Sequence, residues 1–145
     1  MKLSTKGRYG LRAVVDIACN CQNEPASLSS IAARQSLSES YLEQLIAKLK
    51  KAGIVISVRG SSGGYHLAKM PDAITVGDVL RALEGDLTVC QCVEEKEDCA
   101  RFDECVTKYV WARINNSINQ VVDSMTIQEV IDFGKGNGKE DDIHE

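Results

Sequence analysis

The sequence predicts a mainly α-helical protein with one small β-hairpin and a long helix in its C-terminal half. Apolar residues recur at three- and four-residue spacing in several separate segments, which is the pattern of a buried helix face. One short alternating segment flanks a glycine-rich run, as in a hairpin. A chain of 145 residues that is 43% hydrophobic and 26% charged can build one core without disulfides. This composition excludes collagen-like and fully disordered classes.

Three helices are predicted in the first 53 residues. The first covers residues 4–18, the second covers residues 28–35, and the third carries an inward leucine stripe and ends at Gly53. Residues 36–38 read as a tight turn between the second and third helices. Two short helices joined in this way, the second with an outward polar row, are typical of a helix-turn-helix.

A hairpin follows the third helix at once. Residues 54–58 alternate and are rich in β-branched side chains, residues 59–64 form a glycine-rich tip, and residues 65–67 return as the partner strand. The order of elements therefore predicts a winged helix-turn-helix domain over residues 1–85. A last helix near residues 75–83 would close it, with Thr75 and Asp78 spaced as a capping box.

The C-terminal half divides into three predicted parts. Residues 86–105 have no sustained period and are rich in acids and cysteines. Residues 106–131 are predicted to hold a helix of about 20 residues, roughly 30 Å long, and a short helix behind a Thr126 and Glu129 capping box. We expect residues 132–145 to form a mobile tail. The long apolar face predicts dimerisation; the alternative is that this helix lies across its own domain.

Charge is distributed unevenly along the chain. Residues 1–70 hold 10 Lys and Arg against 4 Asp and Glu, whereas residues 71–145 hold 7 against 17, within a net charge of -4. A basic N-terminal half suits phosphate binding, although a chance asymmetry of solvated faces is the alternative. No segment approaches the roughly 18 apolar residues of a membrane span, and the N-terminus lacks the apolar segment of a signal peptide. We therefore expect a cytoplasmic protein without a membrane partner.

The predicted contacts with double-stranded DNA lie on the third helix and on the hairpin. The first residues of the second helix of a helix-turn-helix meet base edges in the major groove, and an arginine at a hairpin tip suits a narrow minor groove. A carboxylate at Glu43 can accept from cytosine; the alternatives are a capping box with Ser40 or a solvated charge. The predicted DNA contacts are Lys6, Ser38, Ser40, Tyr41, Glu43, Gln44, Arg59, Ser61, Gly63, Gly64 and Tyr65.

Six cysteines in a chain expected to be cytoplasmic favour metal or redox chemistry over structural disulfides. Cys19 and Cys21 diverge on the first helix and are interpreted as packed or partly exposed side chains. The other four form the pattern Cys90-x-Cys92-x6-Cys99-x5-Cys105. This spacing leaves zinc, an iron–sulfur cluster and a redox disulfide open. No nucleophile, base and orienting acid stand out, so the chain is not expected to be an enzyme.

Four strings carry a specific resemblance: LSTKGRYGL at 3–11, LSESYLEQLIAKLKKAGIV at 37–55, SVRGSSGGYHLA at 57–68 and AITVGDVLRALEG at 73–85. The chain resembles the bacterial winged-helix regulators that include IscR, the iron–sulfur cluster biogenesis regulator, CymR, the cysteine-metabolism repressor, and the nitric oxide sensor NsrR. The resemblance extends from residue 1 to about residue 131. It implies a homodimer, a DNA-binding domain and a long helix that crosses between subunits.

The resemblance also implies a ligand set for the cysteine segment. IscR-like and NsrR-like members hold an iron–sulfur cluster there, and the matching positions are Cys92, Cys99 and Cys105. IscR has a histidine where this chain has Lys108, and a protonated lysine has no lone pair to donate. We expect a 2Fe-2S cluster, with 4Fe-4S as the alternative. The candidates for the fourth ligand are Cys90, Asp103, Glu104 and a group of the partner subunit.

The resemblance thus predicts a homodimeric, DNA-binding transcription regulator that senses iron–sulfur cluster status and controls cluster biogenesis genes. A scaffold protein that donates clusters would be a further partner. One alternative is a clusterless, CymR-like repressor of cysteine and sulfur metabolism that answers to a partner or to thiol oxidation. The other is an electron carrier.

Overall fold

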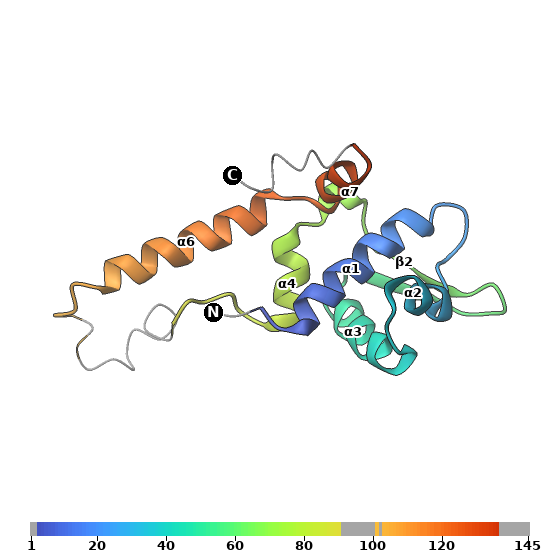
Figure 1. The fold of residues 1–145 in the computed structure, drawn as a ribbon, viewed down its shortest axis with the longest axis horizontal. Coiled ribbons are helices and arrows are strands. Elements are labelled where there is room, and N and C mark those ends of the chain that lie inside the picture. The colour runs from blue at the N-terminus through green and yellow to red at the C-terminus, as the bar shows by residue number, and fades with distance from the viewer. Residues whose placement is uncertain (1–2, 91–100, 102, 137–145) are drawn as a thin grey trace.

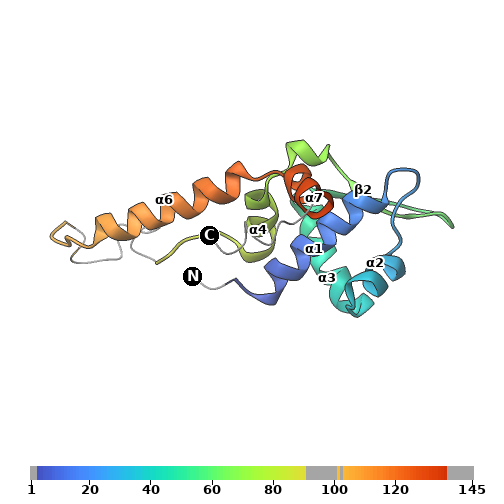
Figure 2. The ribbon, with the colours of Figure 1, turned by 45° about the horizontal axis from the view of Figure 1, so that its top comes forward.

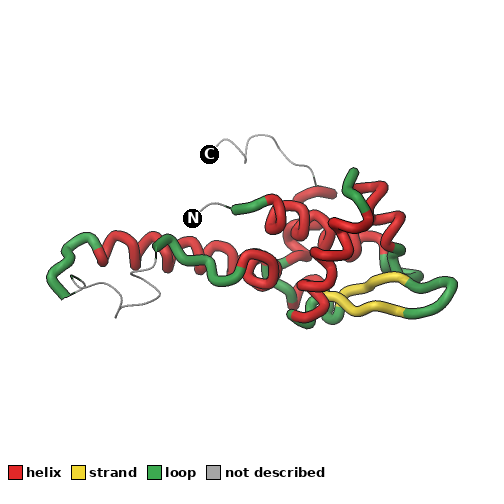
Figure 3. The backbone as a smooth tube through the Cα atoms, turned by 90° about the horizontal axis from the view of Figure 1, so that it is seen from below, coloured by secondary structure: helices red, strands yellow, loops and turns green. Residues whose placement is uncertain are grey.

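The computed structural model of the chain describes residues 3–90, 101 and 103–136. It is mainly α-helical with one two-stranded antiparallel hairpin, as the sequence predicts (Figure 1). The hairpin and α6 lie at opposite ends of the molecule in all three views (Figures 1, 2 and 3). In chain order the elements are α1 (Thr5–Asn20), α2 (Leu28–Gln35), α3 (Glu39–Lys51), β1 (Val55–Val58), β2 (Gly64–Leu67), η1 (Pro71–Ala73), α4 (Val76–Glu84), α6 (Lys108–Ser124) and α7 (Ile127–Lys135).

The main core lies between α1, α3 and α4. Each helix contributes the apolar stripe that its sequence period predicts, and α2 and α7 close the sides. Ile17 on α1, Leu45 on α3 and Val79 on α4 are at most 2% exposed. The N-caps also follow the sequence, because the side chains of Ser4, Ser27, Ser38 and Thr75 all accept backbone hydrogen bonds at helix starts.

The hairpin is attached to the helices through the loop between α1 and α2. Ala26 and Tyr65 exchange two backbone hydrogen bonds, of 2.9 Å and 2.8 Å. Gly64 permits this contact, since a Cβ at that position would lie 2.4 Å from the Ala26 carbonyl oxygen. The direction of the hairpin is therefore set by the same loop that starts α2.

α4 packs closely along the first turns of α1. A Cβ at Gly10 would lie 2.1 Å from the Leu83 side chain, and one at Gly7 would lie 2.7 Å from the Glu84 carboxylate. Glu84 accepts hydrogen bonds from the backbone N–H groups of Ser4 at 3.0 Å and Gly7 at 2.9 Å, and from the Ser4 hydroxyl. The carboxylate therefore caps the N-terminus of α1 from a different helix.

The C-terminal helices differ from the prediction in their ends. α7 extends to Lys135, four residues beyond the predicted end and into the segment expected to be a tail, because Gln128 donates to Asp132 and the Gly136 N–H bonds the Asp132 carbonyl. Of the predicted Thr126 box the structure gives the Glu129 N–H bond to the Thr126 hydroxyl, at 3.1 Å. The rest of the expected tail, residues 137–145, lies outside the described residues. In the described ranges no helix has the length and apolar character to cross a membrane.

Candidate nucleic-acid interface and cysteine site

The start of α3 is built by a serine cap. The Ser38 hydroxyl accepts from the Tyr41 N–H at 3.1 Å, so Ser38 is the N-cap and the Ser40 and Glu43 capping box does not form. Ser38, Ser40, Glu43 and Gln44 are all exposed, and Glu43 has no hydrogen bond or ion pair with any described residue. The first turn of α3 therefore presents hydroxyl, carboxylate and amide groups to solvent, as a base-reading helix requires.

Tyr41 is only partly available for an external contact. Its side chain is half-buried, its hydroxyl lies 3.3 Å from the Thr5 hydroxyl, and its ring meets the Tyr9 ring edge-on with centroids 6.3 Å apart. Tyr41 thus holds the first turn of α3 against the first turn of α1, in addition to the DNA contact predicted for it.

The hairpin tip leaves its arginine and serines outward. Arg59 and Ser61 are exposed, Gly60 turns the chain at φ 116°, and the Gly63 N–H bonds the Gly60 carbonyl at 3.0 Å. A Cβ at Gly63 would lie 2.3 Å from the Val58 carbonyl oxygen, so this glycine is required by the turn itself.

Three of the contacts predicted on the hairpin therefore have internal roles. Gly63 closes the hairpin turn, while Gly64 and Tyr65 hold the hairpin to Ala26, and Tyr65 also packs on the core. A role toward DNA for these residues stays a prediction. Arg59 and Ser61 have no such internal partner among the described residues.

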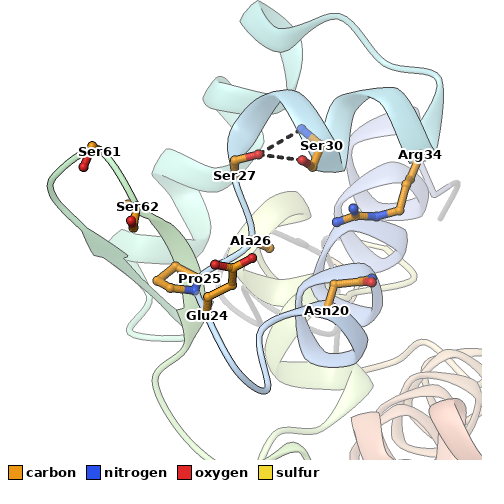
Figure 4. A pocket seen from close by; sticks show the side chains of 10 residues that line it. Asn20, Glu24, Pro25, Ala26, Ser27, Ser30, Arg34, Ser61 and Ser62 are labelled. Atoms are coloured by element: carbon orange, nitrogen blue, oxygen red, sulfur yellow. Dashed lines mark hydrogen bonds between the residues drawn. The ribbon is translucent and has the colours of Figure 1, made fainter.

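A polar hollow separates the hairpin tip from the start of α2 (Figure 4). Ser61 and Ser62 lie on its hairpin side, and Ser27 and Ser30, joined by a hydroxyl bond of 2.7 Å, lie on its helix side.

Lysines missed by the sequence prediction lie at the other end of α3. Lys6, a predicted contact, lines one hollow together with Lys48 and Lys51. All three side chains are exposed, and none has an ion pair within the described residues. The outward row of α3 in the sequence already contains Lys48 and Lys51, so the signal was present but was used only for periodicity. Arg81 and the Glu84 carboxylate also line this hollow, so its charge is positive on balance and suits a phosphate backbone.

Two of the four clustered cysteines are described. The half-buried Cys105 lies just before α6, and its sulfur is 3.1 Å from the Thr107 hydroxyl. The Thr107 hydroxyl, the backbone N–H groups of Thr107 and Lys108, and the Lys108 charge together lower the pKa of the Cys105 thiol. The site therefore stabilises the thiolate, which is the form that binds metal, relative to that of an ordinary cysteine.

The other predicted ligands Cys92 and Cys99 lie outside the described residues, and Cys90 is half-buried. Cys19 and Cys21 lie at the C-terminal end of α1, where they are exposed and half-buried, respectively, as expected. Among the described residues no group of three potential ligands is assembled. Of the cysteine segment, the structure therefore describes the first residues, up to Cys90, and the end that carries Cys105.

The boundary of the cysteine segment is tied to α6 by amide side chains. Asn115 accepts from the Val89 N–H at 3.2 Å, and Asn119 donates to the Leu87 carbonyl at 3.1 Å. One turn further, Asp123 pairs with Arg81 of α4 at 2.6 Å, and Arg81 also donates to Asn119 at 2.7 Å. This polar row at four-residue spacing was missed by the sequence prediction, which followed only the apolar positions of the helix.

These contacts form a continuous connection. The chain next to Cys90 contacts α6, α6 contacts Arg81 of α4, and Glu84 of the same helix caps α1. The pKa of Glu84 is lowered by its bonds to Ser4 and Gly7 and by the Lys6 charge, and the pKa of Asp123 is lowered by Arg81. Both carboxylates are therefore ionised partners at neutral pH.

Comparison with known proteins agrees with this architecture. A family model described as "Rrf2: Iron-dependent Transcriptional regulator" matches residues 3–132. The regulator CymR of Bacillus subtilis is 43% identical over 94% of each chain. The regulator IscR of Aliivibrio salmonicida is 41% identical over 90% of this chain and 77% of its own.

Solved structures give the same relationship. A structure of B. subtilis CymR, described as the global cysteine regulator, has a TM-score of 0.78 and 42% identity, and covers 92% of this chain and 98% of its own. A T. potens IscR structure has a TM-score of 0.74 and 48% identity, over 92% and 88%. The structural similarity confirms the winged-helix fold. The relatives are named as transcriptional regulators, which confirms the resemblance and agrees with the prediction that the chain is not an enzyme. The chain belongs to the Rrf2 family of DNA-binding transcriptional regulators.

Proposed function

We propose that the chain is a homodimeric regulator whose DNA binding depends on an iron–sulfur cluster held by Cys92, Cys99 and Cys105. The observation that carries the proposal is the position of Cys105, just before α6 and at the end of a four-cysteine segment, with its sulfur 3.1 Å from the Thr107 hydroxyl. The fourth ligand is Cys90, Asp103, Glu104 or a group of the partner subunit, because Lys108 cannot serve. A 2Fe-2S cluster is the form we expect.

The electrostatics support binding to duplex DNA. Lys6 of α1 and Lys48 and Lys51 at the end of α3 line one hollow and are exposed, and Arg59 is exposed at the hairpin tip. Phosphates would be met by these cations, while Ser40, Glu43 and Gln44 would face base edges. Such a division of labour gives α3 the selectivity and the flanking cations the affinity.

The exposed face of α6 supports a homodimer. α6 has no buried residue, and Val110, Trp111 and Ile114 are 48%, 37% and 40% exposed. Apolar side chains at helical spacing along 17 residues form a surface that a second copy of the helix can cover. Two copies would place two α3 helices on one operator.

The contacts of α6 with α4 give the cysteine segment a connection to α3. When bound, the cluster would supply a labile link that joins the cysteine segment to the start of α6. Asn115 and Asn119 hold that segment, Arg81 holds Asp123, and Glu84 holds α1, whose Thr5 contacts Tyr41. A coupling of about 1–3 kcal/mol through such contacts corresponds to a roughly 5- to 150-fold change in DNA affinity.

The test is the visible spectrum of protein purified without oxygen, with iron and sulfide measured on the same sample. The Cys92→Ala variant should lose the colour, the iron and the sulfide, whereas Cys19→Ala, on the surface of α1, should keep them. DNA binding is then measured with and without the cluster. Colourless wild-type protein, or binding that is identical in both states for every duplex tested, would overturn the proposal.

A second candidate is a clusterless regulator similar to CymR. It is favoured by the 43% identity to B. subtilis CymR over 94% of the chain. It predicts iron-free protein under strictly anaerobic purification and DNA binding that responds to thiol oxidation or to a protein partner. The same spectrum therefore separates the two candidates.

A further inference from the structure

α1 makes a set of polar contacts with the end of α2 that the hydrophobic core does not require. The carboxylate of Asp16 is 3% exposed and accepts from two nitrogens of Arg34, at 2.7 Å and 3.0 Å, and from the Gln35 amide at 2.8 Å. A buried carboxylate with this many donors fixes the positions of all its partners. Asp16 thus holds the last two residues of α2 against α1.

Arg12 lies one turn earlier on α1 and also binds Gln35. Its Nε donates to the side-chain oxygen of Gln35 at 2.9 Å, and its Nη2 donates to the backbone carbonyl of Gln35 at 3.1 Å. Gln35 is the last residue of α2, and Ser36 follows it in the left-handed region at φ 55°. Non-glycine residues seldom adopt this conformation, so the turn into α3 is held by its surroundings.

The contacts continue to the first turn of α3. The Arg12 guanidinium lies 5.3 Å from the centre of the Tyr9 ring, and that ring meets Tyr41 edge-on at an interplanar angle of 87°. Tyr41 follows the Ser38 cap and lies beside the exposed Ser40. Arg12 therefore contacts Gln35, just before the turn, directly, and it is connected to Tyr41, just after the turn, only through the Tyr9 ring.

We propose that Arg12 and Gln35 are positioning residues that set how α3 lies in the major groove, and thereby determine discrimination between DNA sequences. This inference rests on the proposed binding of DNA through α3. Hydrogen bonds to base edges need close placement of the helix, because they are directional. Contacts of lysines with phosphates are less directional, so they tolerate a small rotation of α3. Loss of the contact between Arg12 and Gln35 should reduce selectivity between DNA sequences and leave the affinity for unrelated DNA unchanged.

The test uses the full-length protein and two duplexes. One is a high-affinity duplex selected by the wild-type chain from a random library, and the other is a scrambled duplex of the same composition. Arg12→Lys keeps the charge but lacks the two guanidinium nitrogens that bond the side-chain oxygen and the backbone carbonyl of Gln35. Gln35→Ala removes the acceptor side chain without a change of charge. Arg8→Lys is the matched control, since Arg8 also lies over Tyr9, at 5.8 Å, but has no hydrogen bond to α2.

We expect Arg12→Lys and Gln35→Ala to lower the ratio of the two affinities by about tenfold, the usual effect of one mismatched base pair. Affinity for the scrambled duplex and the slope of log affinity against log salt should not change. Arg8→Lys should keep the wild-type ratio. Measurements are made below the thermal transition of every variant. A general loss of stability would weaken binding to both duplexes equally, whereas a misplaced α3 would weaken binding to the selected duplex alone.

An unchanged ratio in both variants would overturn the inference. So would a salt slope lower by about one in Arg12→Gln, which removes the charge, because Arg12 would then be a phosphate contact. A wild-type chain that selects no duplex would overturn the proposed function itself, which is a different result from the failure of the two variants.

Discussion

The winged domain, formed by α1 to α4 with the hairpin, and α6 treat their apolar side chains in opposite ways. In the winged domain Ile17, Leu45 and Leu49 are at most 2% exposed, so the stripes predicted from the sequence meet one another. On α6 no residue is buried, although Ile114 and Val121 follow the same period. The winged domain buries its apolar stripes within the chain, whereas α6 leaves most of its apolar stripe exposed, and we propose that a second copy covers that face. The same sequence period therefore does not by itself say whether a helix face becomes buried within one chain.

A matched pair of side-chain truncations gives the most direct test of this difference between the winged domain and α6. Leu45→Ala should lower the free energy of unfolding by about 2–5 kcal/mol, because it leaves a cavity in a packed core. Val121→Ala, at a side chain 56% exposed, should have an effect that appears only where the protein is dimeric. Urea unfolding at several protein concentrations measures both. A large concentration-independent loss in Val121→Ala would show that α6 is stabilised within its own chain.

A charge on the α6 face tests the interface directly. Ile114→Asp should weaken dimerisation by about 2–4 kcal/mol, because an unpaired carboxylate would be buried between two copies. Sedimentation would record a shift to monomer, while circular dichroism should keep the helical content. Arg113→Asp, at the exposed neighbouring position, is the control. A variant that stays dimeric at the wild-type concentration would contradict the assignment of this face.

The joint between the two regions should respond more weakly. A Cβ at Gly77 would lie 2.1 Å from Asp123 and 2.7 Å from Arg81, so Gly77→Ala must displace this ion pair. The pair is partly exposed, and we expect a loss of about 1 kcal/mol in unfolding free energy. Loss of the same size in Asp123→Asn would locate the effect in the pair. If cluster loading changed the DNA affinity of both variants as much as that of the wild type, the contact between α6 and α4 would not couple the cluster to DNA binding.

Local pattern predicted most of the winged domain. Periodicity placed α1 to α4, the Thr75 and Asp78 box formed with both bonds, and the glycine-rich tip became a turn. These features depend on residues that are close together in the chain, so they can be predicted from a single sequence.

Contacts between distant segments were not predictable in this way. Period alone does not say that Gly7 and Gly10 admit α4, nor that Arg12 reaches Gln35 across 23 positions. Of the predicted interface, Gly64 and Tyr65 turned out to hold the hairpin, because a glycine and a tyrosine beside a turn read the same whether they face a ligand or a loop. Choice of partner depends on the whole fold.

The pH dependence of the α1 cap is the smallest expected effect. Bonds to Ser4 and Gly7 lower the pKa of Glu84 in the folded chain, so its stabilisation is complete above the unfolded value, about 4.3, and is lost as the pH falls through the lower folded value. Glu84→Gln should cost about 0.5–2 kcal/mol near neutral pH, as for other N-caps, and the difference from wild type should shrink in acid. Urea unfolding between pH 3 and 7 measures it. A difference that grows with acidity would mean that the protonated side chain is the better cap, which would contradict the lowered pKa of Glu84 in the folded chain.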